Sequence, residues 1–275
     1  MSLLEVENLR VTFPTRHGPS EVVRGVSFTL GRERLGIVGE SGSGKSQTGR
    51  ALLGLTPPPG KATADRLSFD GSDLRGLSAR EWRSLRGQRM SMVMQDPKFS
   101  LNPVMPVGKQ LMEALRTHGT PRAQAKRASL DMLEAVQIRD PERVFRAYPH
   151  ELSGGMGQRA MIAMMLVSEP DLLIADEPTS ALDVTIQIEV LRILDRLVTD
   201  RGMGLIFISH DLRLVSSFCD RVLVMYAGRV VEELRASELH AAQHPYTRGL
   251  LNCLPQIDGD RRPLPTLDRD AAWAE

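Results

Sequence analysis

The glycine-rich stretch Gly39–Ser46, GESGSGKS, constrains the fold more than any other part of this 275-residue sequence. It follows an apolar run, Leu35–Val38, and leads into a predicted helix over 46–53. The glycines remove side-chain bulk, so consecutive backbone N–H groups can point at phosphate oxygens, and the positive end of the helix adds to the same site. The stretch therefore predicts a phosphate-binding loop in a P-loop fold of the α/β class.

Two side chains of this loop are expected to contact a nucleotide directly. Lys45 would reach the β- and γ-phosphates as a point charge, and the Ser46 hydroxyl would ligate Mg²⁺. A Gly/Ser surface turn is the alternative, but such a turn requires neither Lys-Ser after its last glycine nor a helix behind it. We assign these loop residues to nucleotide binding: Gly39, Ser41, Gly42, Ser43, Gly44, Lys45, Ser46 and Gln47.

Size and charge exclude several classes of protein. With 41% hydrophobic and 25% charged residues, the sequence predicts one large globular domain or a domain with a sizeable insertion. Its 35 basic and 34 acidic residues give a net charge of +1, so no global field favours a nucleic-acid partner. No apolar run reaches the length of about 18 residues that a membrane span needs. The acidic N-terminal segment does not resemble a secretion signal, so we expect a cytoplasmic location.

Extended segments precede the phosphate loop. Residues 2–9 alternate in character and residues 22–30 form a second extended stretch, which together predict an antiparallel β region. Phe13 lies between them in a segment rich in turn residues, and is either an anchor packed into the core or an aromatic that stacks on a purine base. Beyond the loop we expect a short strand near 67–69 and then a polar segment up to Arg89.

The middle of the sequence changes from a strand pattern to a helical one. Met90–Met94 is an apolar strand signal that ends at Gln95, an amide placed where other P-loop proteins have metal and water contacts. From Val107 to about Tyr148 apolar residues recur at helical spacings with no strand between them. We therefore interpret this stretch as a helical insertion in an α/β core.

A second anion-binding turn follows the helical stretch. Ser153 is a natural N-cap for a helix predicted to run through Ser168, and Gly154 and Gly155 expose backbone N–H groups at its positive end. The alternative is an ordinary capped helix with glycine in its cap turn.

Two carboxylates end the next predicted strand, which begins at Leu172. In a P-loop fold an acid at the carboxyl end of a neighbouring strand faces the Mg²⁺, which assigns Asp176 to the metal. Glu177 would lie in line with the γ-phosphate and take a proton from attacking water. The alternative is that the two acids cap the next helix, predicted over 184–198.

The last third of the sequence holds one further candidate. A buried strand predicted over 205–209 ends at His210, on the side where the other reactive residues gather, although a lone histidine is more often structural. A hairpin is expected around Ala227-Gly228, followed by a short helical stretch. The tail over 255–275 is expected to be peripheral or poorly ordered.

Six motifs in order, GESGSGKS, MQDP, LSGGMGQR, LLIADEP, SALD and SH, resemble those of the nucleotide-binding subunit of ATP-binding-cassette proteins. The resemblance covers nearly all of the chain, and LSGG decides it because other P-loop ATPases lack that element. It implies a P-loop cassette fold over 1–252, with an antiparallel β subdomain, an inserted helical subdomain at about 96–165 and a short C-terminal extension over 253–275. The spellings QDPKFSLNP, YPHELSGGM and HPYTRGLL are similar to those of the oligopeptide/dipeptide/nickel importer ATPases.

The resemblance implies a role for each candidate residue, with ATP and Mg²⁺ as ligands. Glu177 would be the general base, His210 would contact the γ-phosphate, and Gln95 would transmit closure to membrane subunits. Phe13 falls near the family's adenine-stacking aromatic. The residues implied around Mg²⁺ are Ser46, Gln95 and Asp176. The residues implied to complete the ATP site of an opposite protomer are Ser153, Gly154 and Gly155, and Gln158 and Asp183 are also implied to bind the nucleotide.

The same resemblance implies an ATPase that powers import of peptides or a related small solute. Its partners would be two membrane permease subunits, a second cassette subunit of related sequence and an extracytoplasmic solute-binding protein. The chain would be peripheral on the cytoplasmic face of the inner membrane. The alternative is an ATPase component of a soluble assembly such as a carbon–phosphorus lyase complex, which shares the HPYT-type ending, although SLNP and SQT favour the importer.

Two other cassette ATPase classes fit less well. A DNA-repair or chromosome-structuring ATPase needs a long coiled coil that this sequence lacks. A translation-factor ATPase needs two cassettes in one chain, and a single set of motifs is present here.

Two features depart from the family pattern. Gly157 stands where the family usually has Arg or Gln, which adds backbone freedom near a helix start. Cys219 and Cys253 form no C-x-x-C arrangement, so we expect two small, partly buried residues in a reducing compartment and no metal site. Many peptide-importer ATPases carry a four-cysteine cluster near the C-terminus. No cysteine follows Cys253 here, so we expect no such cluster.

Overall fold

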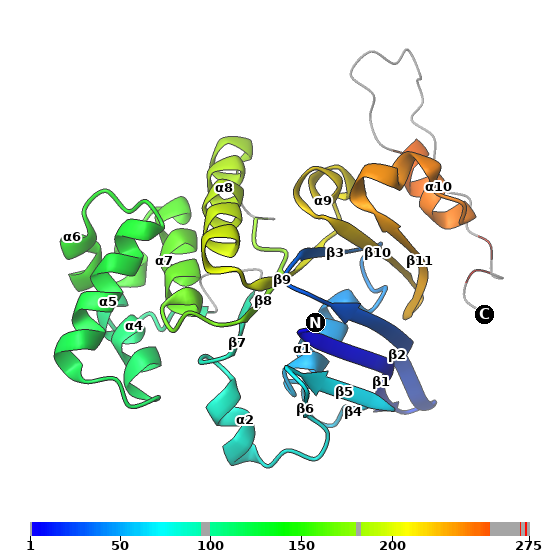
Figure 1. The fold of residues 1–275 in the computed structure, drawn as a ribbon, viewed down its shortest axis with the longest axis horizontal. Coiled ribbons are helices and arrows are strands. Elements are labelled where there is room, and N and C mark those ends of the chain that lie inside the picture. The colour runs from blue at the N-terminus through cyan, green and yellow to red at the C-terminus, as the bar shows by residue number, and fades with distance from the viewer. Residues whose placement is uncertain (1, 95–99, 180–182, 254–269, 271–272, 274–275) are drawn as a thin grey trace. The chain divides into compact units, whose positions relative to one another are not determined.

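The computed structural model describes residues 2–94, 100–179, 183–253, 270 and 273. The chain divides into two compact units. Unit 1 comprises residues 1–77 and 206–275, and unit 2 comprises residues 78–205. Unit 2 is thus inserted between the two halves of unit 1, and each is described separately below (Figure 1).

The first sheet of unit 1 is antiparallel, which confirms the β region expected ahead of the phosphate loop. Its order is β2-β1-β5-β6, and β4 pairs with β1 as well. Alternate residues of β1, among them Leu4 and Val6, are buried, as a half-buried strand requires. The strands are β1 Leu4–Thr15, β2 Gly18–Leu30, β4 Lys61–Thr63, β5 Arg66–Phe69 and β6 Ser72–Asp73.

Phe13 lies within β1 and not in a turn. It pairs with Ser20 of β2, and the ladder continues to the pair Thr15 and Gly18. The turn-rich segment predicted around Phe13 is therefore wrong, because Pro14 and Gly18 sit at the end of a hairpin whose strands pair almost to its tip. The half-buried Phe13 ring packs against Gly60, where an added Cβ would lie 2.4 Å from a ring carbon.

The second sheet of unit 1 carries the phosphate loop. Its strands are β3 Arg34–Val38, β10 Arg221–Tyr226 and β11 Arg229–Arg235, and β9 Gly204–Ser209 enters the unit beside β3. Strand β10 pairs parallel with β3 and antiparallel with β11, which confirms the predicted hairpin. The helices of unit 1 are α1 Lys45–Leu52, α9 Leu212–Phe218, α10 Pro245–Asn252 and the 3-10 turn η2 Ala236–Ala241.

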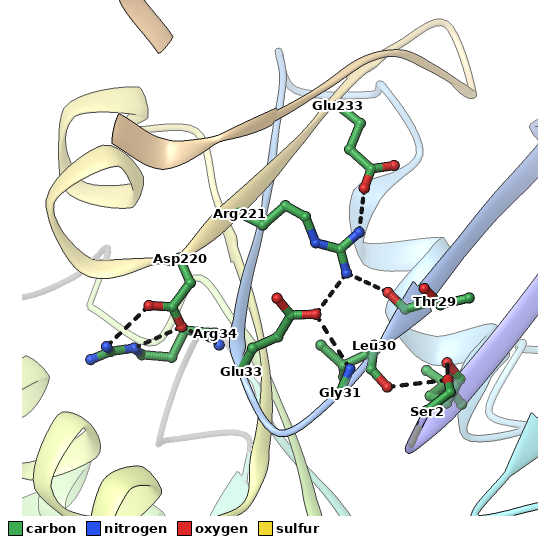
Figure 2. Close-up of polar contacts among 10 residues, drawn as sticks. Ser2, Thr29, Leu30, Gly31, Glu33, Arg34, Asp220, Arg221 and Glu233 are labelled. Atoms are coloured by element: carbon green, nitrogen blue, oxygen red, sulfur yellow. Dashed lines mark hydrogen bonds and ion pairs between the residues drawn. The ribbon is translucent and has the colours of Figure 1, made fainter. Parts of the chain in front are cut away.

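A charged cluster fixes the place where β3 starts (Figure 2). The Arg221 guanidinium contacts the carboxylate of Glu33 at 2.7 Å, and it also pairs with Glu233 and donates to the Thr29 carbonyl. Burial lowers the pKa of Arg221, but the hydrogen bonds to Glu33 and Glu233 outweigh it and hold the pKa above its ordinary value. The strand that leads into the phosphate loop is thereby tied to β2, β10 and β11.

Unit 2 combines two parallel strands with helices. Strands β7 Met90–Val93 and β8 Leu172–Asp176 pair in parallel, as expected for buried strands of an α/β core. In α4 the buried residues Val107, Leu111 and Leu115 recur every fourth position, which confirms the predicted helical pattern. The helices are α2 Ala79–Leu85, α4 Val107–Arg116, α5 Arg122–Ala135, α6 Pro141–Arg146, η1 Pro149–Glu151, α7 Gly154–Leu166 and α8 Val184–Arg201.

Helix α2 lies in the segment that the sequence indicated only as polar. The Ser78 hydroxyl accepts a hydrogen bond from the Glu81 N–H at 3.3 Å, and the Glu81 carboxylate accepts one from the Ser78 N–H at 2.7 Å. This is the capping box that the spacing S-x-x-E encodes. None of the residues of α2 is buried, so no apolar periodicity revealed the helix.

Three remaining expectations concern cysteines, membrane spans and domain limits. Cys219 is buried and Cys253 is partly exposed, as predicted. Within the described ranges, no helix has both the length and the apolar character to cross a membrane. Helices α4 to α7 all belong to unit 2, whereas the limits of the predicted insertion, 96–165, and of the extension, 253–275, remain predictions.

Candidate nucleotide-binding site

The phosphate loop is held in shape by backbone hydrogen bonds. The Ser43 N–H donates to the Glu40 carbonyl at 3.1 Å, and the Ser43 carbonyl accepts from the Gly228 N–H at 3.1 Å. Gly44 has a φ of 98°, and a Cβ added there would lie 2.5 Å from the Val22 carbonyl oxygen. Only glycine fits this position, and its lack of a side chain allows the tight backbone curve that a phosphate cradle needs.

Lys45 sits inside the curve of the loop. Its ammonium group donates to the carbonyl oxygens of Gly39 at 2.7 Å and Glu40 at 2.8 Å. The residue is only 6% exposed, and Ser43 Oγ lies 3.4 Å from the same nitrogen. A cation held against backbone at the start of α1 provides the countercharge that a polyphosphate requires, so the loop residues fit a nucleotide.

A cavity of about 350 Å³ in unit 1 adjoins the loop. Three predicted site residues line it, Gly39, Ser41 and His210. His210 is exposed and lies between the end of β9 and the start of α9, where Asp211 caps the helix. The structure thus brings a histidine from the second half of unit 1 to the same cavity as the phosphate loop.

The two carboxylates of unit 2 follow β8 as expected. Asp176 is the last residue of the strand and is 5% exposed, and the next residue, Glu177, is half-buried. Glu177 has a φ of 47°, in the left-handed region that costs a residue with a side chain about 1 kcal/mol or more. They do not cap the next helix, because α8 begins only at Val184 and its N-cap is Asp183.

The signature turn LSGG opens α7 as predicted. The Ser153 hydroxyl accepts a hydrogen bond from the Met156 N–H at 3.4 Å. The start of α8 lies beside it, because a Cβ added to Gly155 would be 3.1 Å from the Ile186 side chain. The Asp183 carboxylate caps α8 by accepting from the N–H groups of Thr185 and Ile186 at 3.1 Å.

These two helix starts share a cavity of about 710 Å³ within unit 2. Four predicted residues line it: Ser153, Gly154, Gly155 and Asp183. The sequence analysis missed three arginines in its wall, Arg139, Arg143 and Arg159. Arg159 is the last residue of the motif LSGGMGQR and could have been found there, but Arg139 and Arg143 flank the start of α6 and belong to no motif.

Comparison with known proteins identifies the family of this chain. The family model described as ABC transporter matches residues 23–180, more than half of the chain. The chain belongs to the ABC transporter family. It is an ATPase of that family, and the likeness read from the six motifs is confirmed.

Several curated relatives match this cassette over almost its entire length. The oligopeptide transport ATP-binding protein OppD of Salmonella typhimurium is 48% identical over 96% of this chain and 80% of its own. The dipeptide transport ATP-binding protein DppD is 45% identical in Escherichia coli, over 97% of this chain and 83% of its own. The DppD protein of Bacillus subtilis is 47% identical over 97% and 81%.

Solved structures confirm the cassette fold. The dimeric MJ0796 protein, described as a bacterial ABC transporter cassette, has a TM-score of 0.75 and 24% identity, and the match covers 85% of this chain and 98% of that one. CbiO1 from Clostridium perfringens, part of the ABC transporter complex cbiONQ, has a TM-score of 0.74 and 27% identity over 87% and 91%. The predicted α/β cassette class is therefore correct.

Four other predicted residues of the cassette have distinct outcomes. Gln95 lies outside the described residues. Gln158 is 1% exposed and donates through its side-chain amide to the Pro178 carbonyl, so its amide is engaged inside unit 2. Ser46 and Gln47 lie in the first turn of α1, and both are partly exposed.

Proposed function

We propose that this chain is the ATP-hydrolysing subunit of an importer for peptides or a related small solute. The observation that carries the proposal is the near-complete match to oligopeptide and dipeptide transport ATP-binding proteins, which covers 96–97% of this chain. The phosphate loop supports it, because the buried Lys45 ammonium and the glycine-only curve at Gly44 suit a triphosphate.

In this proposal the residues of unit 1 bind the nucleotide. Lys45 and the backbone N–H groups of the loop from Gly42 to Ser46 hold the phosphates, and His210 contacts the γ-phosphate. Phe13 stacks on the adenine, a role that suits a partly exposed ring. The cavity shared by Gly39, Ser41 and His210 supports their common role.

Three further residues would supply the Mg²⁺ ligands, and Glu177 the base. The hydroxyl of Ser46, the amide of Gln95 and the carboxylate of Asp176 are oxygen ligands of the kind that Mg²⁺ prefers. When bound, Mg²⁺ would neutralise charge on the phosphates. Glu177 orients the attacking water and accepts its proton. Its left-handed backbone, held at a φ of 47°, is a strained conformation of the kind that clusters at functional sites.

The signature turn serves the nucleotide of a second cassette subunit. Gly154 and Gly155 present N–H groups at the positive end of α7, and Ser153 and Asp183 line the same cavity. Gln158, in the helix that this turn opens, stabilises it through a hydrogen bond to the Pro178 carbonyl. Two cassettes would therefore enclose ATP between the phosphate loop of one subunit and the signature turn of the other, closing on ATP and separating after hydrolysis.

The chain acts with membrane partners. These are two permease subunits, a second cassette subunit of related sequence, and a solute-binding protein that engages the complex from outside the cell. The chain is peripheral on the cytoplasmic face of the inner membrane. A role in a soluble carbon–phosphorus lyase assembly is not favoured, because the relatives are named as peptide transport proteins.

A pull-down from detergent-solubilised membranes tests this proposal. The affinity-tagged chain should recover two permeases and a second cassette, and the recovered complex should hydrolyse ATP faster when a solute-binding protein with its peptide is added. A parallel pull-down with Glu177→Gln should recover the same subunits with slower hydrolysis. Recovery of soluble enzymes alone would overturn the importer assignment.

A further inference from the structure

Tyr246 of helix α10 contacts the phosphate loop from behind. The ring is fully buried, and its hydroxyl accepts a hydrogen bond from the Glu40 N–H at 3.0 Å. Glu40 is the second residue of the loop, far from Tyr246 in sequence. The HPYT segment therefore contacts the phosphate loop directly.

One peptide group is held on both sides. The peptide bond between Gly39 and Glu40 presents its N–H to the Tyr246 hydroxyl, while its carbonyl, that of Gly39, accepts from the Lys45 ammonium at 2.7 Å. A peptide group is planar, with its N–H and C=O pointing in opposite directions. Fixing the N–H direction therefore fixes the direction of the carbonyl that holds Lys45.

Several hydrogen bonds hold Tyr246 in place. His244 caps α10, with its Nδ1 accepting from the Tyr246 N–H at 3.2 Å, and Pro245 occupies the first turn. The Glu232 carboxylate of β11 accepts from the Gln243 N–H at 2.6 Å. Burial raises the pKa of Glu232, but the nearby Thr247 hydroxyl and the backbone N–H groups of Gln243 and His244 outweigh it and lower the pKa, so the carboxylate stays charged at neutral pH.

Trp273 also packs near Tyr246. The Tyr246 ring lies 4.5 Å from that of Tyr226 and 6.0 Å from that of Trp273, between ring centroids. Trp273 is also 6.0 Å from Tyr226 and 6.3 Å from His244. These are the separations of interacting aromatic pairs. Trp273 therefore belongs to the ring cluster around Tyr246.

Helix α10 borders the reactive cavity as well. Its Leu250 lines the cavity of about 350 Å³ that Gly39, Ser41 and His210 share. The same helix thus holds the loop through Tyr246 and forms one wall of the space beside it.

We propose that Tyr246 is a positioning residue for the phosphate loop and that Trp273 acts on nucleotide affinity through it. The hydroxyl orients the Gly39–Glu40 peptide, the carbonyl of that peptide holds Lys45, and Lys45 meets the phosphates. This inference rests on the proposed function of the loop. It extends control of nucleotide binding to Trp273, which no catalytic motif includes.

The first test compares Tyr246→Phe with Tyr226→Phe in the full chain, using a fluorescent ATP analogue. Tyr246→Phe removes the acceptor and keeps the ring, so we expect about three- to tenfold weaker binding, the range of one neutral hydrogen bond. Tyr226→Phe removes a hydroxyl from the same ring cluster and should bind like the wild type. Tyr246→Phe leaves the Glu40 N–H without this acceptor, so its unfolding midpoint without nucleotide should fall by a few °C. Binding is therefore measured well below the midpoints of all three proteins, where each is folded, and weaker binding under those conditions is an effect that a purely structural role would not produce.

The second test places Trp273 in the same pathway. Trp273→Ala should weaken binding in the same direction, and adding it to Tyr246→Phe should cause no further loss, because coupled residues are not additive. ATP-analogue affinity equal to wild type in Trp273→Ala, or fully additive losses of affinity in the double variant, would overturn the role of Trp273.

Failure of this inference is distinguishable from failure of the proposed function. If the wild-type chain does not bind the analogue, the proposed function falls. If the wild type binds and Tyr246→Phe binds equally well, or both phenylalanine variants weaken alike, only the positioning role of Tyr246 is overturned.

Discussion

The side-chain amide of Gln158 donates a hydrogen bond to the carbonyl oxygen of Pro178. Gln158 lies in α7, the helix that the signature turn opens, and Pro178 directly follows Glu177. Because Gln158 is 1% exposed, neither group has water as a substitute partner. The bond therefore ties the start of the signature helix to the segment that carries the two carboxylates.

Replacing Gln158 by Ala should lower the free energy of unfolding by about 1–3 kcal/mol, because it leaves the buried Pro178 carbonyl without this donor. The change is measurable by urea denaturation of the purified chain. Gln124→Ala is the matched control, since Gln124 is exposed on α5 in the same unit, and it should alter stability by less than about 0.5 kcal/mol. Equal losses in the two variants would contradict a role for the bond.

Replacing Lys45 by Ala should weaken ATP binding by about ten- to a hundredfold, because charge-assisted hydrogen bonds to phosphate contribute about 1.5–3 kcal/mol. Isothermal titration with ATP measures the change. Lys61→Ala removes an exposed lysine from β4 of the same unit and should leave the affinity unchanged. A Lys45→Ala variant with wild-type affinity would show that the loop does not hold the phosphates.

Replacing Glu177 by Gln should leave ATP binding close to that of wild type and reduce turnover by about 10²- to 10⁴-fold, the usual contribution of a general base. The phosphate cradle is untouched, so ATP should trap the closed dimer, visible as a shift on gel filtration. Glu134→Gln, at an exposed position of α5, is the control for loss of a negative charge. Full turnover in Glu177→Gln would remove Glu177 from the role of base.

Replacing Gly36 by Ala should destabilise unit 1 by about 1–3 kcal/mol, because the new Cβ would lie 2.1 Å from the Val215 side chain of α9. At Gly31 an added Cβ meets nothing within 4 Å, so Gly31→Ala should be tolerated. Thermal unfolding of the two variants compares them directly. Similar stability in both would mean that α9 does not pack closely on β3.

The buried Cys219 thiol should make stability fall at high pH. Burial, helped by Asp220 and opposed by Arg34, raises the pKa of Cys219 from 9.0 to about 12. Between those values the unfolded chain has lost the proton that the folded chain keeps. Ionisation therefore favours the unfolded state, and this contribution, absent below pH 9, grows by up to about 1.4 kcal/mol per pH unit above it.

Urea denaturation of wild type and Cys219→Ala from pH 7 to 11 isolates this contribution, because the other titrating groups are common to both. The stability advantage of the wild type should be constant up to about pH 9 and then shrink. At pH 8 a thiol reagent should label the partly exposed Cys253 and spare Cys219 in the folded chain. An advantage independent of pH would contradict the raised pKa.

Local patterns predicted most of the secondary structure, and two failures show their limit. Helix α2 is encoded by a capping box without an apolar face, so hydrophobic periodicity could not reveal it. Phe13 was assigned to a turn because Pro14 and Gly18 favour one, but pairing of β1 with β2 continues past Phe13. In both cases hydrogen bonds decided the structure where side-chain hydrophobicity gave no signal.

Local sequence patterns predict the chemistry proposed for this protein. A phosphate cradle, a helix cap or a strand-end carboxylate depends on neighbours within a few residues, so the motifs from Gly39 to His210 could be read in order and their family inferred. The tertiary structure alone decided which distant residues support them. The contacts of Tyr246 with Glu40, Trp273 with Tyr246 and Gln158 with Pro178 arise from packing, which no local pattern records.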